Sequence, residues 1–171
     1  MIVIGCDPGS RRFGLAVLED REGTIRMLHS ETISLLHADL QQRMHTLWHK
    51  LEAILPRFPL DASALEEGFL GVNARSQNVL AQVRGLVMAS MIHHSIPLTL
   101  YSPRTVKQAV SGNGNAAKDQ VQRVMERLLN LAGGVYGEDE TDAMAVAYCH
   151  LLSRPRGHAS GERRLMPGRR S

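Results

Sequence analysis

Carboxylate residues occur at three places in this chain where they could hold a metal ion. Asp7 follows the apolar run MIVIGC and precedes a proline and a glycine. Glu66 and Glu67 follow the short apolar segment ASAL, and Asp139 and Asp142 lie three residues apart near the start of EDETDAMAVAYCHLL. Carboxylates that are brought together repel one another and raise each other's pKa, and a bound cation removes that repulsion. Oxygen-only ligand sets favour Mg²⁺ or Mn²⁺.

Each of these groups also has an ordinary structural explanation. An aspartate before Pro-Gly is common in turns, and acidic residues in the first turn of a helix interact favourably with its dipole. Adjacent strand residues point to opposite faces, so at most one of Glu66 and Glu67 enters a shared site. Taken together, the three places favour a site of four carboxylates. Such a set suits two ions about 4 Å apart, an arrangement used for in-line attack on phosphodiesters.

The apolar patterning predicts the elements that must bring these carboxylates together. Strands are expected at 1–6, 13–20, 24–33, 62–67 and 96–102, and helices at 38–55, 74–94, 102–110, 117–131 and 138–152. This order predicts one α/β domain with a mixed five-stranded sheet flanked by helices. The first and fourth strands are then parallel neighbours, and their carboxyl ends meet at the edge where ligand sites of such sheets form.

Composition limits the class of protein. A length of 171 residues is typical of one domain, and 43% apolar residues are enough to bury a core. No apolar run reaches the roughly 20 residues of a membrane span, and no signal peptide is evident. Two distant cysteines indicate a reduced, cytoplasmic protein. Residues 154–171 hold six arginines and one glutamate. We therefore predict a domain over 1–152 and a basic, flexible tail over 153–171, which suits a polyanion or is simply solvated.

Four segments, in this order and spacing, resemble the RuvC family of Holliday junction resolvases: IGCDPGSRRFG, ALEEGF, YSPRTVKQAVSGNGNAAKDQVQ and ETDAMAVAYCH. They extend over residues 1–152, and the lysine-bearing segment is the most specific. The resemblance implies a ribonuclease H-like fold, a homodimer and an endonuclease that depends on Mg²⁺ or Mn²⁺. Its substrate would be a four-way DNA junction, cut by paired, symmetric nicks with 5′-phosphate ends during recombination and repair. A helicase that moves junctions is the implied partner.

The resemblance also assigns residues. The family's catalytic, metal-binding carboxylates correspond to Asp7, Glu66, Asp139 and Asp142, which selects Glu66 over Glu67. In the segment DETDAMA, Glu140 and Thr141 replace the two inner alanines of the family's alanine-rich pattern. The first position of the acidic pair varies among relatives, so the role of Asp139 stays less defined than that of Asp142.

Basic and aromatic residues complete the expected site. The resemblance assigns Lys118 to charge neutralisation at the transition state and Lys107 to the DNA backbone. Phe69, in GFLG, would stack on an unpaired base, although packing in the core is the alternative. Further phosphate contacts are predicted for three arginines, Arg75, Arg84 and Arg104.

The sequence leaves open the role of the helix at 74–94 and the exact class of function. The helix at 74–94 carries the small residues Ala81, Gly85 and Ala89 beside an apolar stripe, and it either forms a dimer interface or packs only on its own sheet. An ATPase of the actin and sugar-kinase type would need a second domain, for which the chain has no room. A non-catalytic DNA-binding module, and a same-fold nuclease acting on RNA–DNA hybrids or other branched DNA, remain as alternatives.

Overall fold

The computed structural model describes residues 1–37, 39–68, 74–131 and 136–153 of the chain. Its strands are β1 (Ile2–Pro8), β2 (Arg12–Arg21), β3 (Thr24–Ser34), β4 (Ala62–Glu66) and β5 (Leu98–Tyr101). Its helices are α1 (Leu40–Ile54), α2 (Ala74–His93), α3 (Pro103–Ser111), α4 (Lys118–Leu128) and α5 (Glu138–Leu152), with a short 3₁₀ helix at Leu55–Arg57. The predicted order of elements is confirmed.

The strands form one mixed sheet in the order β3-β2-β1-β4-β5. β1 pairs with β2 and β2 with β3 in antiparallel fashion, while β4 runs parallel to both β1 and β5. Cys6 is in register with Leu65, so the next residues, Asp7 and Glu66, end neighbouring strands side by side. The predicted α/β fold with a mixed five-stranded sheet is confirmed, and so is the parallel pairing that the carboxylate argument required.

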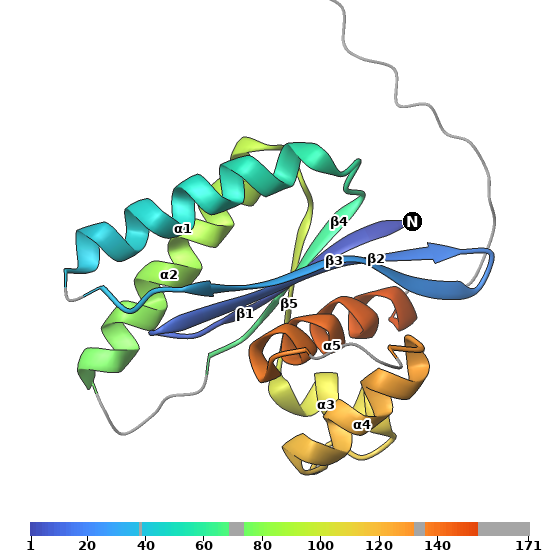
Figure 1. Ribbon diagram of the computed structural model, residues 1–171. Coiled ribbons are helices and arrows are strands. Elements are labelled where there is room, and N and C mark those ends of the chain that lie inside the picture. The colour runs from blue at the N-terminus through green and yellow to red at the C-terminus, as the bar shows by residue number, and fades with distance from the viewer. Residues whose placement is uncertain (38, 69–73, 132–135, 154–171) are drawn as a thin grey trace, which may run out of the picture.

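Helices cover both faces of the sheet (Figure 1). On one face, α1 and α2 pack through apolar side chains such as Leu47, Leu51, Val83 and Val87. On the other face lies α5, with α3 and α4 beyond it, and the apolar run Ala143–Ala147 is buried there. A helix that is apolar on nearly all sides needs cover on nearly all sides, and α5 has it from the sheet and from α3 and α4.

Two glycines allow α5 to lie directly on the strands. A Cβ added at Gly5 in β1 would overlap the carbonyl oxygen of Ala143, and one at Gly14 in β2 would overlap the carbonyl oxygen of Asp139. Any side chain at either position would push the helix away from the sheet. The close approach brings the first turn of α5 beside Asp7, because Asp7 and Gly14 are paired across β1 and β2.

No helix within the described ranges is long and apolar enough to cross a membrane. The predicted tail lies, apart from residue 153, outside the described residues, so the proposed division at 152 and 153 stays a prediction. α5 ends at Leu152.

Candidate active site

Carboxylates from three elements converge at the carboxyl edge of β1 and β4. Asp7 and Glu66 are both half-buried at the ends of these strands, and both face the α5 side of the sheet, as do Gly5 and Ala64 two residues earlier in each strand. Asp142 enters from the first turns of α5. Glu67, by contrast, is exposed, so the structure places Glu66 rather than its neighbour in the cluster.

The members of the cluster affect one another's pKa values. Burial, followed by the negative charges of Asp142 and Asp139, raises the pKa of Asp7 to about 7. Burial and the charges of Asp7 and Asp142 raise the pKa of Glu66 to about 7 as well. Burial likewise raises the pKa of Asp142, against the opposing effect of Lys118. In the metal-free protein Asp7 and Glu66 are therefore partly protonated near neutral pH, although free aspartate and glutamate would be ionised.

Asp139 lies at the margin of the cluster. Its carboxylate is 3.8 Å from the guanidinium of Arg12, an exposed residue at the start of β2. The charge of Asp139 also contributes to the raised pKa of both Asp7 and Asp142, but not to that of Glu66. The structure thus brings all four predicted carboxylates into one region, with Asp139 the most peripheral.

The two residues that depart from the family's alanine-rich pattern have structural contacts here. The Ser30 hydroxyl of β3 donates to the Glu140 carboxylate at 2.5 Å, and the Gly137 amide donates to it at 3.4 Å. The buried Thr141 hydroxyl donates to the Gly137 carbonyl at 3.1 Å. The bond from Ser30 fixes the first turn of α5 against the sheet, and the two bonds with Gly137 cap the helix, so the departure leaves Asp139 and Asp142 in place.

Lys118 is the cation of the cluster. It is the first residue of α4, and its ammonium lies 2.8 Å from Asp142 and 3.2 Å from Glu138. Burial lowers its pKa, but hydrogen bonds and charge attraction from Asp142 and Glu138 outweigh that effect, so the net pKa is raised and the side chain stays protonated. Lys118, Lys107, Glu66 and Asp142 line one pocket of about 130 Å³.

The side chain of Gln108 in α3 makes two hydrogen bonds to the glycine-rich loop before Lys118. The Gln108 side chain donates to the Gly112 carbonyl at 2.8 Å and accepts from the Gly114 amide at 3.0 Å. Gly112 closes α3 with a positive φ of 73°, which favours glycine. This arrangement sets where α4 starts, and hence where Lys118 enters the pocket.

The donor atoms of the cluster fit a hard divalent cation. No lysine or arginine in the described part of the chain forms an ion pair with Asp7 or Glu66, although the charge of Lys118 acts on both and that of Lys107 on Glu66. Their oxygens, with those of Asp142 and Asp139, form a set without nitrogen or sulfur. Such a set is typical of Mg²⁺ or Mn²⁺, and a bound cation would offset both the burial and the mutual repulsion that raise the pKa values of Asp7 and Glu66.

The predicted DNA-contacting residues differ in how much of them the structure describes and in how exposed they are. Phe69 falls outside the described residues, and of Arg75 only its position in α2 is described. Arg84 is half-buried and packs under Gly68, two residues beyond Glu66, and its buried Nε has no hydrogen-bond partner among the described residues. Arg104 is exposed on α3 and packs against Gly114 of the glycine-rich loop.

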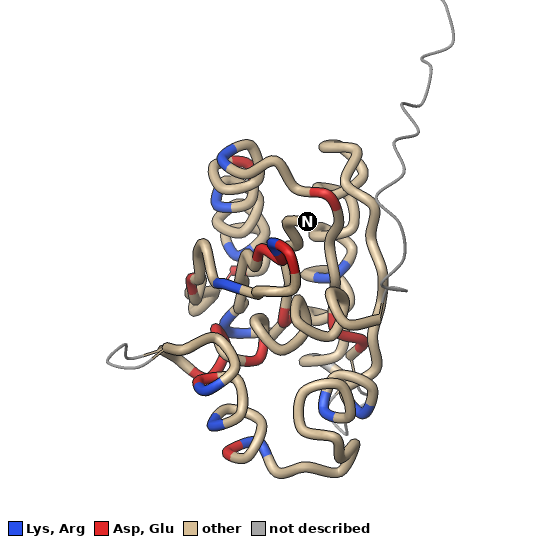
Figure 2. The backbone as a smooth tube through the Cα atoms, turned by 90° about the vertical axis from the view of Figure 1, so that its right-hand side faces the viewer, with Lys and Arg blue, Asp and Glu red and all other residues tan. Residues whose placement is uncertain are grey.

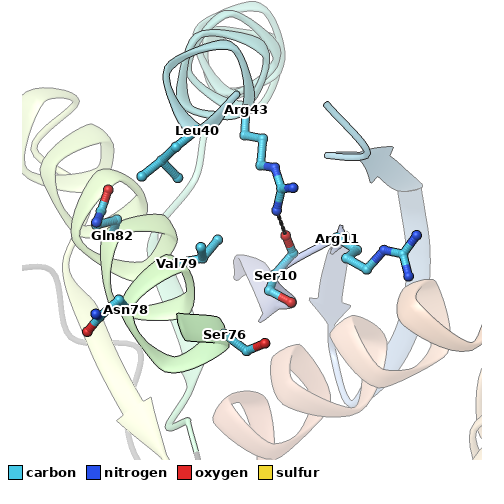
Figure 3. A pocket seen from close by; sticks show the side chains of 8 residues that line it. All are labelled: Ser10, Arg11, Leu40, Arg43, Ser76, Asn78, Val79 and Gln82. Carbon is cyan, nitrogen blue, oxygen red and sulfur yellow. Dashed lines mark hydrogen bonds between the residues drawn. The ribbon is translucent and has the colours of Figure 1, made fainter. Parts of the chain in front are cut away.

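Sequence reasoning missed a second hollow beside the carboxylates. A pocket of about 400 Å³ lies between the β1–β2 turn and the first turns of α1 and α2. Figure 3 shows Arg43 of α1 reaching down to the turn, where its guanidinium donates to the Ser10 carbonyl at 2.9 Å. Its lining residues are Ser10, Arg11, Leu40, Arg43, Ser76, Asn78, Val79 and Gln82.

Two arginines and several polar side chains line this pocket, together with the apolar Leu40 and Val79. Arg11 is exposed, and α2 contributes hydroxyl and amide groups from Ser76, Asn78 and Gln82. A third hollow, lined by Arg11, Arg12 and Asp139, continues towards the carboxylates. Arginine, serine and asparagine at a groove are typical phosphate contacts. The sequence signal was weak because Arg11 and Arg43 come together only through folding.

Charge is not separated into two faces of the body. Figure 2 shows acidic and basic positions interspersed along the described backbone. Attraction for a polyanion therefore depends on local groups, such as the arginine-lined pocket and the lysines beside the carboxylates, rather than on one broad positive surface.

Sequence comparisons agree with the resemblance. The family model described as "Crossover junction endodeoxyribonuclease RuvC" matches residues 3–150. The crossover junction endodeoxyribonuclease RuvC of Chlorobaculum parvum is 41% identical over 152 residues, which cover 88% of this chain and 81% of the relative. The protein of the same name from Anaeromyxobacter dehalogenans is 43% identical over 157 residues, covering 90% and 82%.

Structural comparison gives the same result. The structure described as Thermus thermophilus RuvC in complex with Holliday junction substrate has a TM-score of 0.82 at 29% identity, over 88% of this chain and 93% of that chain. The yeast mitochondrial Holliday junction resolvase Ydc2 has a TM-score of 0.60 at 15% identity, over 86% of this chain and 77% of that chain. This likeness shows a shared fold.

Proposed function

Because the chain belongs to the RuvC family of crossover junction endodeoxyribonucleases, we propose that it resolves four-way DNA junctions by paired, symmetric nicks during recombination and repair. The observation that carries the proposal is the convergence of Asp7, Glu66 and Asp142 with Lys118 at one edge of the sheet. Buried carboxylates with raised pKa values beside a lysine suit metal-dependent phosphodiester hydrolysis.

The protein's own residues have distinct parts in this chemistry. Asp7, Glu66 and Asp142, with Asp139 at the margin, would hold Mg²⁺ or Mn²⁺, and four carboxylates are enough for two ions. Such cations supply a nucleophilic water and neutralise phosphate charge. Lys118 lies within reach of the same pocket and would stabilise negative charge that develops on the phosphate. The products would be a 5′-phosphate and a 3′-hydroxyl end.

Selection of a junction requires contacts beyond the carboxylates. We assign phosphate contacts to Lys107, Arg75, Arg84 and Arg104, and to Arg11 in the polar pocket, and base stacking to Phe69. A junction offers two equivalent strands, and a two-fold homodimer would supply two matching sites. The exposed face of α2 supports this state, because Ala81, Gly85, Ala89 and the 74% exposed Ile92 lie on it without cover in the described protein. A branch-migration helicase is the partner proposed on family grounds.

A cleavage assay tests the function. Synthetic immobile four-way junctions, linear duplex and an RNA–DNA hybrid of equal length would be incubated with Mg²⁺, Mn²⁺ or EDTA. We expect paired nicks, with ligatable ends, on the junction alone and only with a divalent cation. Cleavage of the hybrid instead would identify a same-fold nuclease of different substrate. Tight junction binding without any cleavage would indicate a non-catalytic binding module.

The raised pKa values predict how metal binding depends on pH. Because Asp7 and Glu66 have folded pKa values of about 7, above their ordinary range, the metal-free folded state binds more protons than the unfolded state between about pH 4 and 7. Its stability therefore falls as pH rises through that window. A cation binds only the ionised carboxylates, so Mg²⁺ should stabilise the protein more at pH 8 than at pH 6.

Thermal unfolding with Mg²⁺ or EDTA at the two pH values measures this effect. We expect the increase in Tm on adding Mg²⁺ to be clearly larger at pH 8. The Asp7→Asn variant, which lacks one of the titrating groups, should show a smaller Mg²⁺ effect at both. An equal increase at pH 6 and pH 8 in the unmodified protein would contradict the assigned ligands.

The polar pocket gives a prediction for DNA binding. Arg11→Ala should weaken junction binding several-fold. It should also reduce the slope of log K against log salt concentration by about one, the amount that one phosphate contact contributes. The reason is that Arg11 is exposed and its side chain makes no ion pair in the described protein. Junction Kd would be measured over a salt series in EDTA. Arg57→Ala is the matched control, since Arg57 follows α1 at the far edge of the sheet. Equal losses for both variants would argue against a phosphate site in the pocket.

A further inference from the structure

A second group of metal-ligating side chains lies away from the carboxylates. Glu52 of α1, His93 at the end of α2 and His94 just beyond it each offer one ligand atom, and these atoms lie within 4.8 Å of one another. β4 ends at Glu66 and leads into α2, which runs back to His93 before β5 begins at Leu98. His93 and His94 are therefore at the edge of the sheet opposite the carboxylates.

The three ligands are held by contacts that orient them towards one another. His94 Nε2 lies 3.1 Å and 3.2 Å from the two carboxylate oxygens of Glu52. The rings of His93 and His94 meet edge to face, with centroids 5.1 Å apart. The turn that follows is fixed by hydrogen bonds from Ser95 N to Ile92 O and from Ile96 N to Met91 O, with Ser95 at a φ of 56°. The backbone of both histidines is thus constrained before any ion binds.

The chemistry of this set differs from that of the carboxylate cluster. Two imidazoles and one carboxylate make up the ligand set of several zinc sites, with water at the fourth position. Ligand atoms around tetrahedral Zn²⁺ lie about 3.4 Å apart, as bond lengths near 2.0–2.2 Å require. Glu52 and His94 already have that spacing. His93 is exposed, so its ring is free to make the small rotation that remains.

We propose that Glu52, His93 and His94 form a binding site for Zn²⁺ or a chemically similar ion that prefers imidazole ligands. The site would join the end of α1 to the end of α2 and so stabilise the helical layer on that face of the sheet. It supplies no group to the carboxylates at the other edge. Mg²⁺ is excluded as its occupant, because a hard ion that prefers oxygen gains little from two imidazoles.

The single tryptophan of the chain is a built-in reporter for this site. Trp48 lies one turn before Glu52 on α1, and its ring centroid is 6.3 Å from that of His93. Ni²⁺ has the same preference for imidazole and quenches nearby indole fluorescence, so it can serve as the probe. Titrations would be made with Ni²⁺ in millimolar Mg²⁺, which occupies the carboxylate cluster. Zn²⁺ would then be added as a competitor, and its effect on Tm would be measured separately.

Variants separate this site from the other histidines on α1. His45 and His49 lie four residues apart, with their Nε2 atoms 2.9 Å from each other, and such a pair could also bind Ni²⁺. We expect a saturable quench with one ion per chain, reversed by Zn²⁺, and an increase in Tm with Zn²⁺. Glu52→Gln and His94→Gln should each weaken binding more than about tenfold, while the His45→Ala/His49→Ala double variant should bind normally.

Three outcomes would overturn the proposal. Absence of a saturable quench in the unmodified protein would show that Glu52 and His94 form only an ion pair. Loss of binding in the His45→Ala/His49→Ala variant, with His94→Gln unaffected, would place the ion on α1 alone. Quenching by Mg²⁺ to the same extent would mean that Trp48 responds to the carboxylate cluster. Glu52→Gln can still accept a hydrogen bond from His94, and circular dichroism would verify that each variant is folded.

Discussion

Replacing Asp7 by asparagine is expected to abolish junction cleavage and to leave junction binding nearly unchanged. The carboxylate of Asp7 is central to the cluster: burial and the charges of Asp142 and Asp139 raise its pKa, and its own charge in turn raises that of Glu66. An amide keeps the shape of the side chain but binds a divalent cation poorly. Loss of the several kcal/mol that metal ions contribute corresponds to a decrease of at least about a thousandfold in rate.

Binding and folding should respond differently from cleavage. DNA affinity rests on basic groups, so the Kd for the junction in EDTA should stay within a few-fold of the original value. The variant should be at least as stable as the unmodified protein without metal at pH 8, because a buried, repelled charge has been removed. Single-turnover cleavage, junction binding and Tm would be measured together.

The neighbouring glutamates provide a matched control for this experiment. Glu66→Gln should reduce cleavage as Asp7→Asn does, since Glu66 lies beside Asp7 in the cluster. Glu67→Gln should have little effect on cleavage, because Glu67 is exposed. Near-normal cleavage by Asp7→Asn, or equal losses for the two glutamate variants, would refute the metal assignment.

Much of the fold was predictable because apolar periodicity decided it. Buried strands such as β1 and β2 and the nearly all-apolar helix α5 leave few alternatives, and Pro56 correctly predicted the end of α1, which is followed by a 3₁₀ turn. The close contact of α5 with the sheet was not predicted. Nothing in the local sequence says that Gly5 and Gly14 face a helix backbone, since that contact joins segments more than 120 residues apart.

The site was predictable in part for a similar reason. Residue type and position at strand ends indicated Asp7 and the two glutamates. The alternation of side chains along a strand shows that only one glutamate can enter the site but not which one, and the family resemblance selected Glu66. The ion pair of Arg12 with Asp139 and the contact of Arg43 with the Ser10 carbonyl were not foreseen. Both depend on the angle at which elements pack, which local patterns do not encode.

Lys118 supports the second prediction with a large expected effect. Lys118→Met should lower the rate of cleavage about 100- to 1,000-fold, the usual loss when one charged or hydrogen-bonding group at a transition state is removed. Its ammonium is 2.8 Å from Asp142 and shares a pocket with Glu66, so it is placed to contact a phosphate held by the carboxylates. Methionine keeps an unbranched side chain of nearly the same length and removes the charge.

Two simpler explanations of that loss would be separated by other variants. If Lys118 acted only by pairing with Glu138, then Glu138→Gln would have the same effect. Glu138 is 70% exposed, however, and we expect that variant to cleave almost normally. If Lys118 served only to hold DNA, then Lys118→Met would weaken junction binding as much as cleavage, and Lys107→Met would behave in the same way.

The pH profile gives the sharpest measurement of the role of Lys118. Its positive charge lowers the pKa values of Asp7, Glu66 and Asp142, so its removal should raise all three further. The residual cleavage of Lys118→Met should therefore need a higher pH to reach its plateau than that of the unmodified protein, at equal Mg²⁺. A lower plateau at an unchanged pH midpoint would assign Lys118 to the phosphate alone. A shifted midpoint with a fully restored plateau at high pH would show that Lys118 acts by keeping the carboxylates ionised and ready for metal.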